Sequence, residues 1–150
     1  MGIPKLIRTE TASNDASLSF VDGASSVVLD STYDEYMFVF TDIGPATDDV
    51  TFQFQVNATD DAGGGYDTSL ITSSYFRAIH TEDDTTTALL AYDTGADLSQ
   101  AASFQFLGSG IGNGSDESLA GIMHLFNPSS TTYVKHFYGT TSFYGQQNAE

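Results

Sequence analysis

The alternation of hydrophobic and polar positions is clearest in residues 30–57, where two aromatic-rich runs flank a loop of glycine, proline and aspartate. In the second run Phe52, Phe54 and Val56 alternate with glutamines, which predicts a strand with one apolar and one polar face. Residues 36–40 are apolar at successive positions, which predicts a central strand covered from both sides. Together the two runs predict an antiparallel hairpin.

Other short runs of β-branched, aromatic and leucine residues, bounded by turn residues, predict strands on both sides of this hairpin. An Asp-Gly pair between residues 18–21 and 26–29 predicts a second hairpin. Only residues 93–101 leave room for a helical turn. The remaining predicted strands are 3–9, 70–71, 74–80, 88–92, 103–107, 119–126 and 132–138, with a glycine-rich tip at 108–115 and a closing hairpin around 127–130.

This series amounts to about nine or ten short strands at close spacing, which is typical of a sandwich or jelly roll. We therefore expect an all-β fold, a jelly-roll-like antiparallel β-sandwich with little or no helix. A chain of 150 residues is long enough to bury a core, and no shift in composition marks a second domain. Residues 1–150 are thus expected to form a single domain.

The net charge limits the classes of partner that we expect. Four cations face 20 carboxylates, a formal net charge of −16, which disfavours nucleic acid and anionic membranes as partners. The chain has no cysteine, so disulfides and thiolate chemistry are excluded. It carries neither an apolar signal segment nor a run of membrane-spanning length, so we expect it to be made and to fold in a cytoplasm.

Calcium is the metal that the acidic loops would suit best. Asp60, Asp61 and Asp67 surround three glycines, and Asp116 and Glu117 adjoin a second glycine-rich turn. Their oxygens are hard ligands of the kind that calcium prefers. Neither group has the ligand spacing of an EF-hand or of a glycine-aspartate nonapeptide repeat, and adjacent aspartates are common in solvated loops. The expectation is no metal and no cofactor, with Asp60, Asp61 and Asp67 as the calcium candidates.

The three histidines lie on predicted strands. His124 and His136 fall on the two strands of one predicted hairpin, and they share a face only if the pairing register has even parity. A metal site would need a third ligand, which His80 would have to supply. They are either packed histidines or a metal site. For catalysis, the chain has no Gly-x-Ser-x-Gly elbow, and Asn113 stands where a dinucleotide fingerprint needs glycine. We therefore expect no enzyme.

Two further sets of residues are candidates for binding. Lys5 and Arg8 are half of all the cations, and either defend an edge strand by charge or dock onto an acidic partner surface. Exposed aromatics near Asn, Asp and Gln are common in glycan sites, although tyrosines also pack at the rim of a sandwich with their hydroxyls in water. The glycan candidates are Tyr66, Tyr75, Tyr92 and Tyr144.

Four segments carry a family resemblance: residues 31–40, 52–57, 116–121 and 124–138. Together they resemble a group of small, β-rich structural proteins from tailed phages of marine bacteria, and the similarity extends from residue 3 to about residue 144. The resemblance implies a non-enzymatic protein on the exterior of a virion, as a tail fibre or appendage component or as a capsid decoration protein. It also implies assembly in the host cytoplasm into homo-oligomers and with other virion proteins.

Those phage proteins continue past residue 150 with further strands, so this chain is either a shorter version or a part of a longer one. If strands are missing, the sandwich would be open at one edge or completed by a neighbouring chain. Two other functions stay open. One is a carbohydrate-recognition module that binds a host-surface glycan as the receptor-binding part of the same particle. The other is a glycan-cleaving enzyme, although 20 carboxylates single out no catalytic pair.

Overall fold

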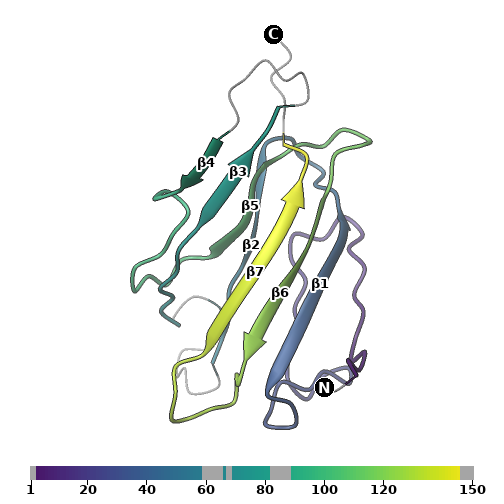
Figure 1. The fold of residues 1–150 in the computed structure, drawn as a ribbon. Coiled ribbons are helices and arrows are strands. Elements are labelled where there is room, and N and C mark those ends of the chain that lie inside the picture. The colour runs from purple at the N-terminus through teal and green to yellow at the C-terminus, as the bar shows by residue number, and fades with distance from the viewer. Residues whose placement is uncertain (1–2, 59–65, 67–68, 82–88, 146–150) are drawn as a thin grey trace. The chain divides into compact units, whose positions relative to one another are not determined.

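The computed structural model describes residues 3–58, 66, 69–81 and 89–145. These residues form seven strands in three antiparallel sheets and contain no helix, so the all-β expectation is confirmed (Figure 1). The sheets have the orders β1-β6-β7, β2-β5 and β3-β4. The strands are β1 (Glu35–Ile43), β2 (Val50–Phe54), β3 (Phe76–Ile79), β4 (Leu89–Tyr92), β5 (Gln105–Ile111), β6 (Leu119–Phe126) and β7 (His136–Phe143).

The predicted hairpin between β1 and β2 is wrong. β1 lies at the edge of its sheet beside β6, and β2 pairs with β5 instead. The prediction that β1 is covered from both sides is also wrong, because Met37 and Val39 are exposed. Alternation along a strand indicates which residues share a face, but it does not indicate which strand pairs with it. The hairpin was predicted because β1 and β2 are consecutive in the sequence, and consecutive strands need not pair.

The chain divides into two compact units, one formed by Met1–Thr41 with Ala120–Thr140, the other by Asp42–Leu119 with Thr141–Glu150. In the first unit Tyr36, Met123 and Leu125 are buried. The Tyr36 hydroxyl donates a hydrogen bond to the backbone carbonyl of Asp30 at 2.9 Å, and burial is the main cause that raises the pKa of Tyr36. The N-terminal segment is therefore held against β1.

That N-terminal segment contains no strand in its described residues 3–34, so the strands predicted at 3–9, 18–21 and 26–29 are wrong. The predicted turn does form: Gly23 has a φ of +76°, and the Asp22 carboxylate accepts a hydrogen bond from the Leu29 amide at 2.8 Å. Phe20 packs edge-on against Phe38, with ring centroids 5.6 Å apart. Hydrogen bonds within the turn and the packing of Phe20 on Phe38 thus hold this segment, in place of the predicted strand pairing.

In the second unit β2 and β5 form the longest pairing, from Val50 opposite Ile111 to Phe54 opposite Gln105. Two register shifts interrupt it, between Val50 and Phe52 and between Phe52 and Gln53. β5 extends to Ile111 and includes Gly108 and Gly110, which the sequence pattern places in a glycine-rich tip at 108–115. The core of this unit consists of Ile71, Ala96, Leu107, Ile111 and Leu119.

One polar residue is buried in this core. The Gln105 side chain accepts a hydrogen bond from the Ser73 hydroxyl and donates to the carbonyls of Ala96 and Phe106, both at 3.1 Å. Satisfied in this way, a buried amide costs little and fixes the segments around it. Within the described residues, no buried side-chain nitrogen or oxygen lacks a hydrogen-bond partner.

The remaining predictions hold in part. β3 and β4 fall within two of the predicted strands, β6 coincides with residues 119–126, and its hairpin with β7 is present. β7 begins four residues later than predicted, at His136 rather than Thr132. Ile71 forms only an isolated bridge with Ala101. Residues 93–101 contain no helix but a single hydrogen-bonded turn, in which the Ala96 amide donates to the Asp93 carbonyl at 3.3 Å.

Candidate interaction surface

One face of the β1-β6-β7 sheet is exposed although its side chains are hydrophobic. Glu35 and Tyr138 both contact His124, which places these residues of the three strands on a single face. Alternation adds Met37, Val39, Ile122 and Phe126 to it, together with the less hydrophobic Thr41, Ala120, His136 and Thr140. We call the following part of this face the apolar sheet face: Glu35, Met37, Val39, Ile122, His124, Phe126 and Tyr138. Its exposed fractions are 46% for Met37, 56% for Val39, 40% for Ile122 and 56% for Tyr138.

Stacked rings form the centre of the apolar sheet face. His124 lies parallel to Tyr138, with centroids 4.6 Å apart and an interplanar angle of 9°, and parallel to Phe126 at 6.2 Å and 13°. Its Nδ1 lies 2.5 Å from Oε1 of Glu35. This contact orients the imidazole ring and engages the acidic group of the face.

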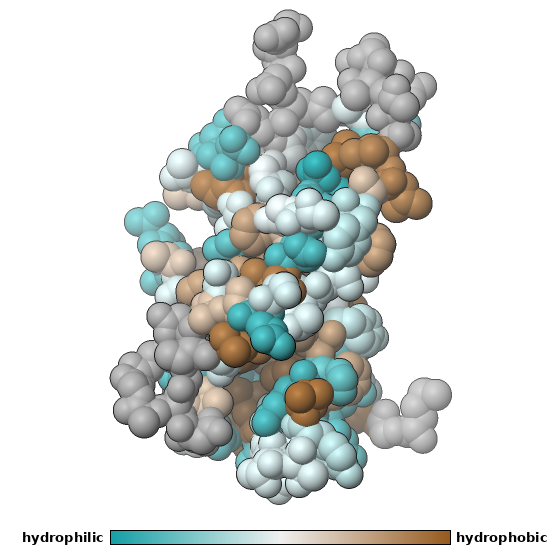
Figure 2. All heavy atoms as spheres, turned by 90° about the vertical axis from the view of Figure 1, so that its left-hand side faces the viewer, coloured by the Kyte–Doolittle hydropathy of each residue, from teal (hydrophilic) through white to brown (hydrophobic). Residues whose placement is uncertain are grey.

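A second exposed apolar region is the β3–β4 hairpin. Phe76 is 68% exposed and Leu90 is 80% exposed, and the Phe76 and Tyr92 rings meet edge-on at 5.1 Å. Ile79 and Leu89 are also exposed. Figure 2 views the molecule from the side on which β4 lies in Figure 1, and shows hydrophobic atoms at the surface among hydrophilic ones.

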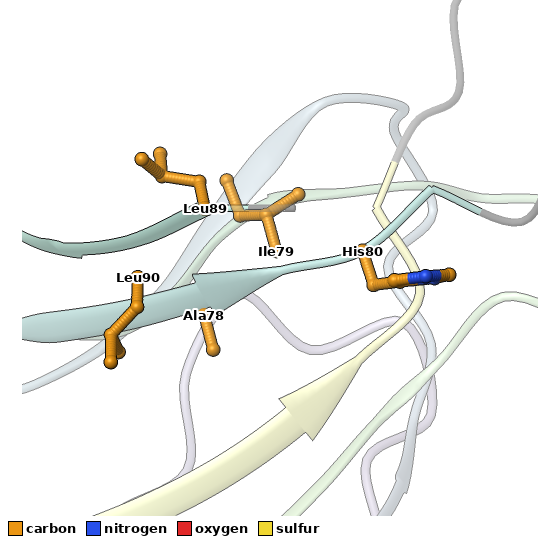
Figure 3. Close-up of a pocket in the computed structure, with 5 residues that line it drawn as sticks. All are labelled: Ala78, Ile79, His80, Leu89 and Leu90. Atoms are coloured by element: carbon orange, nitrogen blue, oxygen red, sulfur yellow. The ribbon is translucent and has the colours of Figure 1, made fainter. Parts of the chain in front are cut away.

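The hairpin also borders a hollow lined by Ala78, Ile79, His80, Leu89 and Leu90. Figure 3 shows that these side chains do not converge: Ile79 and Leu89 project from one side of the ribbon, and Ala78 and Leu90 from the other. A ligand pocket needs convergent side chains and a few placed polar groups. The hollow is the surface of an exposed ribbon rather than a small-molecule site.

The two candidate cations do not lie on a strand. Lys5 and Arg8 are exposed, and Nε of Arg8 lies 2.6 Å from Oε1 of Glu10. The prediction that they defend an edge strand is therefore wrong, because residues 3–9 carry no ladder for them to protect. Their contact with an acidic partner stays a prediction.

The four candidate tyrosines differ in exposure. Tyr66 and Tyr92 are exposed, whereas Tyr75 and Tyr144 are half-buried. Burial is the main cause that raises the pKa of Tyr75, followed by the nearby Asp93 carboxylate. Tyr92 donates its hydroxyl to the Asp97 carboxylate, which raises its pKa. Tyr75 and Tyr92 belong to the same hairpin, because the Asp93 amide bonds to the Tyr75 carbonyl.

The calcium candidates Asp60, Asp61 and Asp67 lie outside the described residues. The second acidic group does not present free ligands, because the Glu117 carboxylate accepts a hydrogen bond from the Gly114 amide at 2.5 Å within its own turn. Within residues 3–58, 66, 69–81 and 89–145, no three His, Asp or Glu side chains gather as a metal site would require. His80, His124 and His136 are therefore not brought together.

Comparison of the chain with protein-family models, with curated proteins and with solved structures finds no match. In the part of the chain that the structure describes, no helix has the length and apolar character needed to cross a bilayer.

Sequence reasoning missed the apolar sheet face. The signal was present in residues 36–40, where apolar side chains point to both sides of the strand. That pattern fits a strand buried on both faces, and it fits equally a strand that is buried on one face and exposes a contact surface on the other.

Proposed function

We propose that this chain is a non-enzymatic structural protein of a virion exterior, which works by contact through the apolar sheet face. The observation that carries this proposal is the set of exposed hydrophobic side chains at outward positions of β1 and β6, beside Tyr138 of β7. Antiparallel sheets with one solvated face normally place polar residues there. A contiguous apolar patch on a soluble chain is typical of a surface that another protein covers.

The place of this protein on a phage particle is supported by the resemblance of residues 31–40, 52–57, 116–121 and 124–138 to structural proteins of tailed phages. Under this proposal the strands form a jelly-roll-like sandwich, and the protein is a tail fibre or appendage component, with capsid decoration as the other position. An acidic chain without cysteine suits assembly in a host cytoplasm, because it avoids both nucleic acid and disulfide exchange.

The chemistry of the apolar sheet face indicates its partner. Its only carboxylate is that of Glu35, which contacts His124, so a chain of net charge −16 presents a single carboxylate here. Apolar contact surfaces depleted of charge are typical of the centre of stable interfaces. The partner is therefore an uncharged, hydrophobic surface of another virion protein.

The proposal is tested on purified particles of a phage that encodes this chain. Mass spectrometry should find the protein in fixed stoichiometry. Val39→Lys places a charge on the apolar sheet face and should remove the protein from particles by about tenfold or more, since burying an unpaired charge costs several kcal/mol. Val39 is half exposed, so the isolated variant should fold.

The matched control is Val134→Lys, which adds the same charge at an exposed position between β6 and β7. It should stay on the particles. Absence of the wild-type protein from particles would refute the virion role, and equal retention of both variants would refute the role of the apolar sheet face.

Carbohydrate recognition is a second candidate, favoured by the exposed Tyr92 ring beside the Asp97 carboxylate. An aromatic face next to a hydrogen-bonding carboxylate is a pair that sugars can stack on and bond to. If it operates, binding on a glycan array should be lost in Tyr92→Ala and kept in Tyr133→Ala, an equally simple truncation of an exposed tyrosine in the other unit. No binding by the wild type, or equal loss in both variants, would exclude Tyr92 as a glycan contact.

A further inference from the structure

The pairing of β3 with β4 determines which backbone groups of β4 point away from the sheet. The Asp93 amide donates to the Tyr75 carbonyl at 2.9 Å, so these two residues form a hydrogen-bonded pair. Such pairs alternate along an antiparallel ladder, and the register continues regularly from Phe76 opposite Tyr92 to Ile79 opposite Leu89. Leu89 and Ala91 therefore bond to β3, whereas the N–H and C=O groups of Leu90 and Tyr92 point outward.

No other described strand pairs with β4, so among the described residues this outward side is an unpaired sheet edge. Soluble proteins usually protect such edges with charged residues, proline or a bulge. β4 has the sequence Leu-Leu-Ala-Tyr and its register with β3 has no shift. None of these three features is present, and the one protective feature that β4 does have is its short length of four residues.

Both faces of the hairpin are also exposed. Phe76, Leu90 and Tyr92 project on one side, and Ile79 and Leu89 on the other, all of them exposed. A ribbon of only two strands is marginally stable in water, and further strands with a shared hydrophobic face stabilise it. The hairpin would gain both backbone bonds and side-chain burial from an added strand.

We infer that β4 is a self-association edge, at which a second copy of this chain adds its own β4 antiparallel to the first, so that two β3–β4 hairpins form one four-stranded sheet. A strand edge is complementary to its own copy about a two-fold axis, since each outward N–H meets an outward C=O of the partner. Leu90 and Tyr92 of the two copies would then lie on one shared face.

Charge favours a second copy over other occupants. Two chains of net charge −16 repel each other except where carboxylates are absent or neutralised. β4 has none, and Asp93 lies 3.1 Å from Nε of Arg77, whereas the Asp97 carboxylate accepts a hydrogen bond from Tyr92 and keeps its negative charge. A cationic partner would be drawn to free carboxylates instead. The inference goes beyond the proposed function, because it uses a different surface and holds whether or not the chain belongs to a virion.

Amide hydrogen exchange of the full chain, measured by NMR at low and high protein concentration, tests the backbone geometry. Leu89 and Ala91 should be protected at both concentrations. Leu90 and Tyr92 should exchange freely when dilute and slow by about tenfold once nine-tenths of the chain is dimeric, since only the remaining monomer exposes them. Equal exchange of Leu90 and Tyr92 at both concentrations would overturn the inference.

Sedimentation analysis of variants locates the contact. Leu90→Pro removes one outward N–H and leaves the ladder to β3 in place, and Leu90→Glu sets two like charges against each other in the dimer. Both should be monomeric at concentrations where the wild type dimerises. Val134→Glu makes the same change in charge at an exposed site of the other unit and should dimerise as the wild type does.

Protection of the Leu89 and Ala91 amides in each variant verifies that the hairpin is folded. If Leu90→Pro disrupts it, Leu90→Glu decides the question. A wild-type chain that stays monomeric at all concentrations would refute the inference, and so would a dimer that persists in the folded Leu90 variants.

Discussion

Leu119→Ala should lower the free energy of unfolding by about 3–5 kcal/mol, the largest effect expected of any single truncation here. Leu119 begins β6 and its side chain is 0% exposed. Removing its three outer carbons loses their burial and leaves a cavity beside Gly108, because the backbone of β5 is fixed by its pairing with β2 and cannot follow. Urea denaturation of wild type and variant measures the difference.

Leu70→Ala is the control for this prediction. It is the same substitution in the same unit, but Leu70 is largely exposed and belongs to no strand, so the change should stay within about 0.5 kcal/mol. If the two variants lost similar amounts of stability, Leu119 would not occupy the core position described above.

Gly108→Ala should lower the free energy of unfolding by about 1–3 kcal/mol, and most of this loss should disappear when Leu119 is already alanine. A Cβ at Gly108 would lie 2.6 Å from Cδ1 of Leu119 and 3.2 Å from Cδ1 of Phe143. The first of these overlaps vanishes with the leucine side chain, and the new methyl group then fills part of the cavity. Urea denaturation of the four chains of the double-mutant cycle measures the coupling.

Gly23→Ala helps to separate this packing effect from a loss of backbone freedom. Gly23 has a φ of +76° and nothing lies within 4 Å of its added Cβ, so its cost comes from backbone conformation alone. That cost should be unchanged by Leu119→Ala. Strict additivity of Gly108→Ala with Leu119→Ala would show that the two residues are not in contact.

Alternation of hydrophobic and polar residues predicted the position of some strands and not of others. Both ends of β6, Leu119 and Phe126, were predicted correctly, because polar turn residues flank this hydrophobic run on both sides. β5 was predicted to stop before Gly108, since glycine weakens the interior of a strand. It continues because that glycine admits the side chains of Leu119 and Phe143, a contact between residues distant in sequence.

The apolar sheet face could not have been predicted for a similar reason. Met37 and Val39 show that one side of β1 is hydrophobic, but exposure is a property of what lies opposite, and nothing local encodes that. His124 was singled out as a metal ligand or packed histidine. Only the pairing of β6 with its neighbours places it between Phe126 and Tyr138 and against Glu35.

By itself, the amino-acid sequence determined that the described chain is all β and where several strands lie. These follow from local preference and alternation, which need no knowledge of neighbours. The tertiary structure alone decided that β1 pairs with β6, that hydrophobic side chains of β1 and β6 are exposed, and that β4 pairs only with β3 among the described strands. Each of these features depends on which strands, distant in sequence, pair with one another. The free energy of pairing is a sum over the whole fold and is not determined by the sequence of one strand.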